Sequence, residues 1–274
     1  MSEYKTILVE KKEGVATITF NRPEAKNAMS PQLHLDMVEA LTDLEYDDEA
    51  RVLVLTGAGD SFCAGQDLKE YFYNIDHDPK ARRRARKAAT EWRSYKLRLI
   101  PKPTIAAING WCFGGAFSIV ASCDIAIAAD EAVFGLSEVN FGKFPGGMVT
   151  KDVTDLFHPR DALFYIFTGR KFDGKQAAAM KFVNYSVPKA RLMEEVYGLA
   201  DELKVKHPEV LRIAKEAYKY GKRFNYEEAY AWATTKSAEL DYVTGKTWKK
   251  GVDQFKKKEM RPGLGSYKWD KDEG

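Results

Sequence analysis

The fold of this 274-residue chain is decided by residues 104–147, TIAAINGWCFGGAFSIVASCDIAIAADEAVFGLSEVNFGKFPGG. Residues 104–109 form an apolar run typical of a strand, and residues 123–128 predict a second strand. Between them, Gly114 and Gly115 open a stretch of small residues that predicts a helix. Glycines between a strand and a helix start let backbone N–H groups approach a ligand closely, with the positive end of the helix dipole behind them. The stretch therefore predicts a site that can hold an oxyanion.

Glu138 lies in the same stretch as a lone carboxylate among apolar residues and glycines. A carboxyl group kept from water has a raised pKa and can exchange protons near neutral pH. The same residue would also suit the first turn of a helix that starts at Ser137, where an acid interacts favourably with the helix dipole. The sequence leaves both interpretations open. The catalytic one requires that Gly115 and Glu138 face the same pocket.

The composition excludes several classes of protein. The chain is 45% hydrophobic and 30% charged, as soluble globular proteins are, and its net charge of +3 is small for its length. It has no recognisable nucleic-acid-binding motif, no apolar stretch of about 20 residues, and no apolar core of signal-peptide length near its beginning. We therefore expect no nucleic-acid partner and no membrane segment.

The cysteine and histidine pattern predicts neither a disulfide framework nor a metal site. Cys63, Cys112 and Cys123 form no CxxC pair, which favours a reducing, cytoplasmic compartment. The histidines are scattered without an HxxxH spacing, so no metal is expected and solvated or capping roles are favoured. They are His34, His77, His158 and His207.

Strand-like and helix-like segments alternate in the first half of the chain, which predicts an α/β fold with a mainly parallel sheet. Ser30 and Pro31 have the residue types of an N-cap and a first helical position, so a helix is expected from there to about residue 46. A long basic helix is expected over residues 80–99. Its buried side would carry Trp92, Tyr95 and Leu99. Further strands are expected at residues 6–10, 15–20 and 52–56, and a short helix at residues 67–73.

After residue 147 the pattern changes to helix. The segments that favour helix are residues 149–157, 161–167, 175–180, 190–206, 209–223 and 226–242. Their apolar stripes predict that they pack on the core or on a neighbouring subunit. The first two-thirds of the chain is expected to form a strand-and-helix core, and no internal repeat is visible in the sequence.

Other phosphate-binding and nucleophilic motifs are absent from the sequence. Neither residues 57–59 (GAG) nor residues 110–115 (GWCFGG) complete GxGxxG, and there is no GK[ST], so the dinucleotide and P-loop interpretations fail. Ser118 lacks a GxSxG elbow, which argues against a serine hydrolase. The basic run 82–87 (RRRARK) could contact phosphates, but a solvated helix face is the favoured interpretation.

Five segments, taken in their order and spacing, resemble the crotonase (enoyl-CoA hydratase/isomerase) superfamily over essentially the whole chain. They are residues 21–28 (NRPEAKNA), 55–57 (LTG), 62–68 (FCAGQDL), 109–115 (NGWCFGG) and 134–147 (FGLSEVNFGKFPGG). The resemblance implies a ClpP-like spiral of repeated ββα units over residues 1–200, which holds the acyl-CoA site. It also implies an α-helical trimerisation region over residues 201–274, and hence a homotrimer or a dimer of trimers (a homohexamer).

The resemblance places the family's oxyanion hole on the backbone N–H groups of Gln66 and Gly115, which would bind the thioester oxygen of an acyl-CoA as it becomes an enolate. Coenzyme A enters only as part of the substrate, and no tightly bound cofactor is implied. The CoA-binding positions carried over are Lys26, Ala28, Ala64, Gly65, Gln66, Asp67, Leu68, Lys69 and Phe255. Lysines suit the phosphates of CoA as point charges.

Ordinary enoyl-CoA hydratases of this family use two glutamates, and Ser118 stands at the position of the first. A site with the single acid Glu138 resembles the 4-hydroxycinnamoyl-CoA (feruloyl-CoA) hydratase-lyase branch, as do residues 67–72 (DLKEYF) and 261–264 (RPGL). This implies that Glu138 handles the protons as water adds to the side-chain double bond, and that Ser118 positions water or the intermediate. Tyr71 is the candidate hydrogen-bond partner of the ring hydroxyl. A retro-aldol step would then release an aromatic aldehyde and acetyl-CoA.

The chain departs from that branch at three places. Gln66 stands where the branch has methionine, Phe144 interrupts an Ile-Pro or Pro-Pro stretch, and a tyrosine that the branch takes from a neighbouring subunit corresponds to about Thr234. Tyr230 and Trp232 lie close by in the sequence. The alternative is hydration or isomerisation of an alicyclic or aliphatic enoyl-CoA without cleavage. A hypothesis of another class is a non-catalytic RNA- or scaffold-binding homologue that uses the helix of the basic run.

Overall fold

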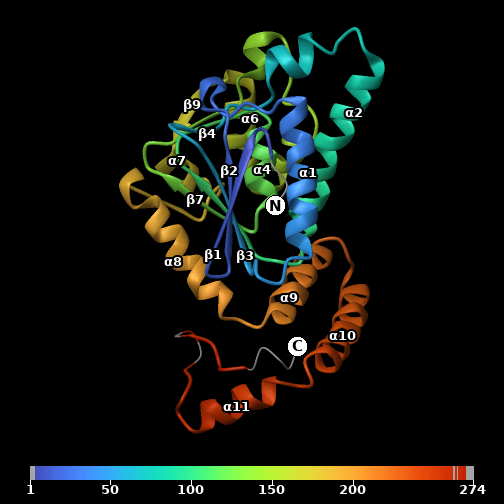
Figure 1. Cartoon of the computed structure of the whole chain (residues 1–274), viewed down its shortest axis with the longest axis vertical. Helices are drawn as coiled ribbons and strands as arrows, with labels where there is room; N and C mark the ends of the chain where they lie inside the picture. Colours follow the sequence, from blue (N-terminus) through green and yellow to red (C-terminus); the bar gives the residue numbers. More distant parts are fainter. Residues whose placement is uncertain (1–3, 262, 264, 270–274) are drawn as a thin grey trace. The chain divides into compact units, whose positions relative to one another are not determined.

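The computed structural model describes residues 4–261, 263 and 265–269 (Figure 1). Pro262 and Leu264 of the closing RPGL segment lie outside the described residues. The chain divides into two compact units. The first holds residues up to 100 together with residues 104–200, and the second holds residues 101–103 and those from 201 onward.

A six-stranded sheet forms the centre of the first unit. Its strands lie in the order β1 (Ile7–Lys12), β2 (Val15–Phe20), β3 (Val52–Gly57), β5 (Thr104–Ile108), β7 (Ile125–Ala129) and β10 (Tyr185–Val187). The β1–β2 pair is antiparallel, and the other pairings are parallel. Every residue of β3 and β5 is buried, as is typical of parallel strands covered on both faces. The mainly parallel sheet that the alternation of strands and helices predicted is confirmed.

A second, smaller sheet orders β4 (Ser61–Cys63), β6 (Trp111–Phe113), β8 (Val133–Gly135) and β9 (Lys171–Asp173). Three times in succession, a strand of the larger sheet is followed within a few residues by a short strand of the smaller one: β3 by β4, β5 by β6, and β7 by β8. Helical segments then return the chain to the next strand pair. This is the repeated ββα pattern that the family resemblance implied, although the sequence shows no internal repeat.

The helices of the first unit begin largely where the sequence predicts. Ser30 caps α1 (Pro31–Glu45) by accepting a hydrogen bond from the Leu33 N–H at 3.1 Å. α1 buries an apolar stripe that includes Leu33 and Met37, and it lies beside α2 (Pro79–Thr90), as Figure 1 shows. The other helices of this unit are α3 (Leu97–Leu99), α4 (Ala116–Ser122), α5 (Val149–Leu156), α6 (Pro159–Thr168), α7 (Gly174–Ala179) and α8 (Leu192–Lys204).

The long helix expected over residues 80–99 is interrupted. After α2 the chain forms a wider π-helical segment, η3 (Glu91–Lys96), before the single turn of α3. The wider turns of a π-helix move the side chains beyond it off the α-helical stripe. Trp92 is buried, as predicted. Tyr95 and Leu99, which come later in the segment, are 60% and 52% exposed, so their expected burial was wrong.

The chain after residue 147 is not purely helical, contrary to expectation. β9 and β10 lie there, and each pairs with a strand that precedes residue 147, so residues 148–200 complete both sheets. Each of these strands has three residues, which is too short for an alternating apolar pattern. The purely helical part begins only after residue 200.

The second unit contains α9 (Pro208–Gly221), α10 (Tyr226–Val243) and α11 (Trp248–Lys256). Arg212 of α9 forms ion pairs with Glu216 of the same helix and with Glu239 of α10, both at 2.8 Å. An aromatic cluster joins the same two helices and consists of Tyr220, Phe224 and Trp232. Within the described part of the chain, no helix has the length and apolar character that crossing a membrane requires.

Candidate active site

Where the glycine stretch meets the loop that follows β4, two backbone N–H groups have no acceptor in the part of the chain that the structure describes. In a parallel bridge, the Met29 N–H donates to Gly65 O at 2.8 Å and the Asp67 N–H donates to Met29 O at 3.0 Å. This pairing turns the Gln66 N–H away from Met29. Gly115 directly precedes the first residue of α4. Neither its N–H nor that of Gln66 donates a hydrogen bond to another described residue.

These two N–H groups and the Glu138 carboxyl group lie close together. A Cβ atom on Gly115 would come within 3.6 Å of Gln66 Cγ, and one on Gly65 within 3.4 Å of the Gly115 nitrogen. One on Gly114 would come within 2.8 Å of Glu138 Oε1. The glycines therefore leave open the space in which backbone donors and a carboxyl group can reach one small molecule.

Glu138 lies on the first turn of the 3-10 helix η4 (Ser137–Phe141) and is half-buried. Its Oε2 atom is enclosed and has no hydrogen-bond partner among the described residues. Burial raises the pKa of the Glu138 carboxyl group above the ordinary value of 4.5, and a hydrogen bond from its own backbone acts in the opposite direction. The group therefore gives and takes protons closer to neutral pH than an exposed glutamate does.

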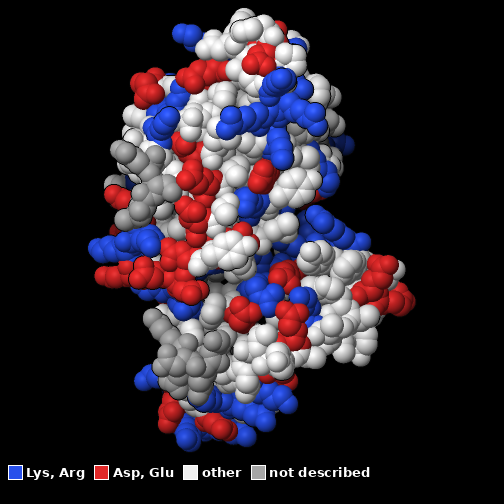
Figure 2. Space-filling view, turned by 45° about the vertical axis from the view of Figure 1, so that its right-hand side comes forward, with Lys and Arg blue, Asp and Glu red and all other residues white. Residues whose placement is uncertain are grey.

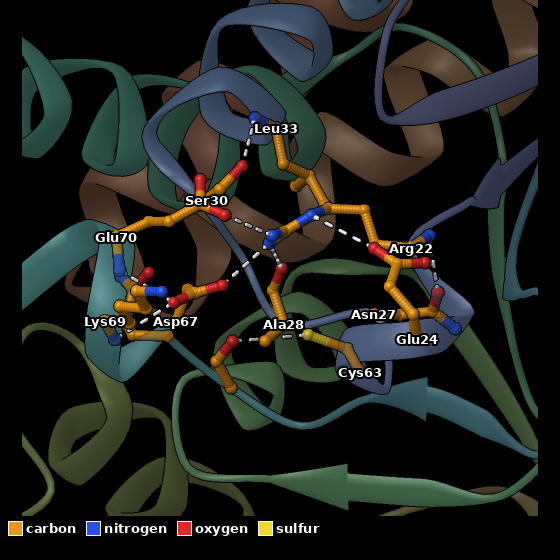
Figure 3. Close-up of polar contacts among 12 residues, drawn as sticks. Arg22, Glu24, Asn27, Ala28, Ser30, Leu33, Cys63, Asp67, Lys69 and Glu70 are labelled. Carbon is orange, nitrogen blue, oxygen red and sulfur yellow. Dashed lines mark hydrogen bonds and ion pairs between the residues drawn. The ribbon is translucent and has the colours of Figure 1, made fainter.

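Arg22 holds the loop that carries Gln66, as Figure 3 shows. Its Nη1 donates to Ala28 O at 2.6 Å and to Asp67 Oδ2 at 2.9 Å, and its Nη2 donates to Glu70 Oε1 at 2.6 Å. One guanidinium group therefore ties the segment before α1 to the segment that follows Gln66. The position of the Gln66 N–H depends on both segments.

Replacing Arg22 by methionine is expected to lower the free energy of unfolding by about 2–4 kcal/mol, because the Asp67 carboxylate would lose the partner that compensates its burial. The two side chains are only 12% and 11% exposed, so solvent screens the pair little. Denaturant unfolding measures the loss. The exposed Arg160→Met variant is the control and is expected to change the free energy by less than about 0.5 kcal/mol. Equal effects in both variants would show that the ion pair does not stabilise the loop.

The Gln66 side chain is in hydrogen-bond contact with a series of buried polar side chains. The Trp92 indole N–H donates to His34 Nδ1 at 2.8 Å, and His34 Nε2 lies 2.9 Å from Gln66 Oε1. His34 is fully buried, so the solvated or capping role expected for it was wrong. Burial and the nearby charge of Arg93 lower the pKa of His34 to about 3, and the imidazole is therefore neutral at physiological pH.

Tyr71 lies next to these side chains, on the π-helical segment η2 (Leu68–Tyr73) that Asp67 caps. Its ring packs edge-on against His34, with 5.3 Å between the ring centroids. Burial raises the pKa of the Tyr71 hydroxyl, and the charge of Arg93 lowers it. The phenol is protonated near neutral pH and can both donate and accept a hydrogen bond.

Ser118 lies on α4 and is 2% exposed, and no hydrogen bond of good geometry reaches its Oγ among the described residues. It adjoins Asp152 of α5, a buried acid that the sequence analysis missed. Burial raises the pKa of Asp152, whereas the Ser118 hydroxyl and the charge of Arg98 lower it. Arg98 Nη2 also donates to Asp152 Oδ1 at 2.7 Å. Ser118 therefore lies beside a carboxyl group that no motif indicated.

A sequence model of the enoyl-CoA hydratase/isomerase family matches residues 10–262. The chain belongs to this family. It is 47% identical over 270 residues to the hydroxycinnamoyl-CoA hydratase-lyase of Pseudomonas fluorescens, a match that covers 97% of each chain. It is 30% identical to the short-chain-enoyl-CoA hydratase of Clostridium acetobutylicum, over 93% of this chain and 99% of that one.

Solved structures of enoyl-CoA hydratases share its fold. The enoyl-CoA hydratase of Bacillus anthracis has a TM-score of 0.85 and 29% identity, over 93% of this chain and 97% of that one. An enoyl-CoA hydratase subunit of Geobacillus kaustophilus has the same TM-score and 31% identity, over 98% and 99% of the two chains. This member of the enoyl-CoA hydratase/isomerase family therefore has the crotonase fold and is an enzyme of the hydratase/lyase type.

The positions predicted to bind CoA in this enoyl-CoA hydratase/isomerase family member differ in exposure. Lys26 is exposed, and its Nζ lies 4.0 Å from the centroid of the Trp111 ring, with Lys171 Nζ at 4.8 Å from the same ring. Among the other positions, Leu68 and Lys69 are exposed, Ala64 is half-buried, and Ala28, Gly65 and Asp67 are buried. Phe255 belongs to the second unit, where it is 53% exposed, and its role in CoA binding stays a prediction.

The residues at the departures from the hydratase-lyase branch are mostly exposed. Tyr230 and Thr234 lie exposed on α10, whereas Trp232 packs in the aromatic cluster of the second unit. Phe144 is 74% exposed.

Lys and Arg side chains gather on one face of the molecule, in the upper part of Figure 2. The basic run of α2 borders an open groove of about 910 Å³. The side chains that line this groove include Arg82, Arg83, Arg86 and Lys87. Most of the run is exposed, as the solvated-face interpretation predicted.

Proposed function

We propose that this enzyme hydrates a 4-hydroxycinnamoyl-CoA-type thioester, such as feruloyl-, coumaroyl- or caffeoyl-CoA, and then cleaves the product to an aromatic aldehyde and acetyl-CoA. The observation that carries the proposal is the half-buried carboxyl group of Glu138 beside the Gln66 and Gly115 N–H groups, which have no acceptor among the described residues. The 47% identity to a hydroxycinnamoyl-CoA hydratase-lyase supports the choice of acyl group.

In the hydration step, the thioester oxygen accepts hydrogen bonds from the Gln66 and Gly115 N–H groups. The Glu138 carboxylate takes a proton from water as the water oxygen bonds to the β-carbon, and the double-bond electrons move to the thioester oxygen as an enolate. Glu138 then returns the proton to the α-carbon. Losing one donor of such a hole typically costs about 10²–10³-fold in rate, so the two N–H groups are the largest single contribution to catalysis.

In the cleavage step, the same carboxylate takes the proton of the β-hydroxyl group. The bond between the α- and β-carbons breaks, an aldehyde forms at the β-carbon, and the bond electrons pass to the enolate of acetyl-CoA. Glu138 then protonates the α-carbon, so no co-reactant is needed. Ser118 positions water or the intermediate, and Tyr71 hydrogen-bonds the para-hydroxyl group, which delocalises charge in both steps.

The CoA part of the substrate is assigned to Lys26, Ala28, residues 64–69 and, from the second unit, Phe255. Residues 1–200 would hold the acyl-CoA site, and residues from 201 onward would form the trimerisation region of a homotrimer or a dimer of trimers. Exposed tyrosines on α10, such as Tyr242 at 88%, suit burial in such an assembly. The free cysteines support a reducing, cytoplasmic location.

Incubation with 4-coumaroyl-CoA or feruloyl-CoA tests the proposal. The expected products are 4-hydroxybenzaldehyde or vanillin together with acetyl-CoA, separated by chromatography. Recovery of the hydrated thioester alone would remove the cleavage step, and recovery of neither product would overturn the proposal. The 30% identity to a short-chain-enoyl-CoA hydratase favours a second candidate, hydration or isomerisation of an aliphatic or alicyclic enoyl-CoA. Faster turnover of crotonyl-CoA than of the aryl thioesters would select that candidate.

Replacing Tyr71 by phenylalanine is expected to lower kcat/KM for 4-coumaroyl-CoA by about tenfold, the value of one net hydrogen bond of about 1.4 kcal/mol. Unsubstituted cinnamoyl-CoA has no ring hydroxyl and therefore does not form this hydrogen bond. Phenylalanine keeps the ring packing on His34, so turnover of cinnamoyl-CoA is expected to stay nearly constant. Steady-state kinetics with both thioesters measures the ratio. Equal losses on the two substrates would mean that Tyr71 only packs.

A further inference from the structure

Arg93 lies beside the two backbone donors, and no described carboxylate forms an ion pair with it. It comes from η3, where its Nε donates to Ala89 O at 3.1 Å and its Nη1 donates to Gly115 O at 3.0 Å. Among the described residues it forms no ion pair. An arginine remains protonated at physiological pH, so a positive charge stands next to Gly115. The Asp152 carboxylate acts on this charge electrostatically, but its ion pair is with Arg98.

The hydrogens of the Trp92–His34–Gln66 chain can be assigned from donor chemistry. An indole N–H can only donate, so His34 Nδ1 is the acceptor and carries no hydrogen. In a neutral ring, Nε2 then carries the hydrogen and donates to Gln66 Oε1. The reverse orientation of the Gln66 amide loses this hydrogen bond, but its oxygen then accepts from Arg93 Nη2 and its nitrogen donates to Met29 O, both at 3.2 Å.

In either orientation a neutral amide end of Gln66 faces Arg93 Nη2 at 3.2 Å, so the amide does not neutralise the charge of the guanidinium group. The backbone N–H groups of Gln66 and Gly115 find no acceptor among the described residues, and a Cβ atom on Gly115 would lie 3.0 Å from Arg93 Nη1. The surroundings of the hole are therefore rich in donors and positive charge, which favours an oxygen that gains negative charge.

We infer that Arg93 is a positioning residue of the oxyanion hole, which orients Gly115 through its carbonyl oxygen and stabilises the enolate with an unneutralised charge. The inference rests on the proposed function, because it takes the Gln66 and Gly115 N–H groups as the donors to the thioester oxygen. Its action is electrostatic, since low-dielectric surroundings screen a charge less than water does.

Kinetics of Arg93→Met and Arg93→Lys test the inference. Methionine removes the charge and is expected to lower kcat for hydration at least about tenfold, short of the 10²–10³-fold loss of a direct oxyanion donor. KM is expected to change by less than about threefold, because the charge acts mainly on the enolate. Lysine keeps the charge and is expected to recover most of the rate. Arg160→Met, an exposed arginine on α6, is the matched control and is expected to retain the wild-type rate. A lysine variant as slow as the methionine variant would overturn the electrostatic role.

A spectroscopic signature separates this role from a structural one. In the Glu138→Gln background, bound cinnamoyl-CoA is expected to absorb at longer wavelength than free cinnamoyl-CoA, because the hole polarises the thioester carbonyl. Adding Arg93→Met is expected to reduce that shift while the thioester Kd changes by less than about threefold. Thermal unfolding of each variant reports any loss of fold. An unchanged shift would show that Arg93 only packs.

The two proposals fail in different ways. If the wild-type enzyme leaves 4-coumaroyl-CoA intact, hydrates crotonyl-CoA, and still shows the Arg93-dependent shift, the proposed substrate is wrong and the inference holds. If it cleaves 4-coumaroyl-CoA and Arg93→Met is equally fast, the substrate is right and the inference is overturned. Cinnamoyl-CoA is used in the binding experiment because that experiment requires only that the thioester carbonyl of the ligand enters the oxyanion hole.

Discussion

Replacing Glu138 by glutamine is expected to lower the rate of enoyl-CoA hydration by about 10²–10⁴-fold, the contribution of a well-placed general acid–base group. Glutamine keeps the shape of the side chain and removes its titratable proton. Affinity for the CoA thioester is expected to stay within about threefold, because the variant leaves the Gln66 and Gly115 N–H groups in place. Steady-state kinetics and a binding titration measure the two quantities. Glu39→Gln, an exposed acid on α1, is the control and is expected to retain full activity.

The raised pKa of Glu138 also predicts two pH dependences. The carboxylate form is needed to take a proton from water, so kcat/KM is expected to fall on the acid side at a pH above 4.5. For stability, a raised folded-state pKa contributes stability that is present below the unfolded pKa and is lost as the pH rises through the folded value. Glu138→Gln stays neutral, so it is expected to be more stable than the wild type at about pH 7, with the advantage shrinking toward about pH 4. Two results would contradict this account: a fall of kcat/KM on the acid side only at or below pH 4.5, or a Glu138→Gln variant no more stable than the wild type near neutral pH.

Replacing Gly110 by alanine is expected to lower the free energy of unfolding by about 3 kcal/mol or more, because an added methyl group has no space there. Its Cβ would overlap the carbonyl oxygen of Asp60 and lie 2.6 Å from the carbonyl carbon of the same residue. Both atoms belong to the backbone beside β4, so no side-chain rotation relieves the contact. The pairing of β4 with β6, which places Gly115, is expected to weaken with it.

Thermal unfolding measures this loss, with a fall in melting temperature of about 2–4 °C for each kcal/mol in a protein somewhat smaller than this one. Gly146→Ala is the matched control. A Cβ there would have only the carbonyl oxygen of Phe144 nearby, at 3.8 Å, so a change of less than about 0.5 kcal/mol is expected. If the two alanine variants have the same melting temperature, the close approach at Gly110 has no energetic consequence.

α1 illustrates what a sequence pattern can predict. Ser30 and Pro31 act within a few residues of themselves, because a cap and a first-turn proline satisfy or remove N–H groups of the helix start. The apolar stripe that includes Leu33 and Met37 packs against the hydrophobic core, which requires only the helical period of the sequence. The helix therefore begins at Pro31 and ends at Glu45, within one residue of the expected end.

The candidate site was only partly predictable. Gln66, Gly115 and Glu138 were identified because the family resemblance attaches roles to motif positions, and the structure has them close together. His34 was missed, although its place on the apolar face of a predicted helix was a signal of burial. For Arg93 there was no signal, because an arginine in a basic helical segment is normally solvated.

The sequence by itself determined the local elements, the motif glycines and the family, since caps, turns and periodic apolar residues act over a few positions. Only the tertiary structure decided which distant residues meet. β4, β6 and β8 have three residues each, and their pairing follows from the longer strands that precede them. The π-helical segment η3 and the parallel sheet bring Arg93 to Gly115, where its guanidinium group forms no ion pair with a described residue. These contacts depend on backbone pairing and burial between segments far apart in the chain, which no local pattern encodes.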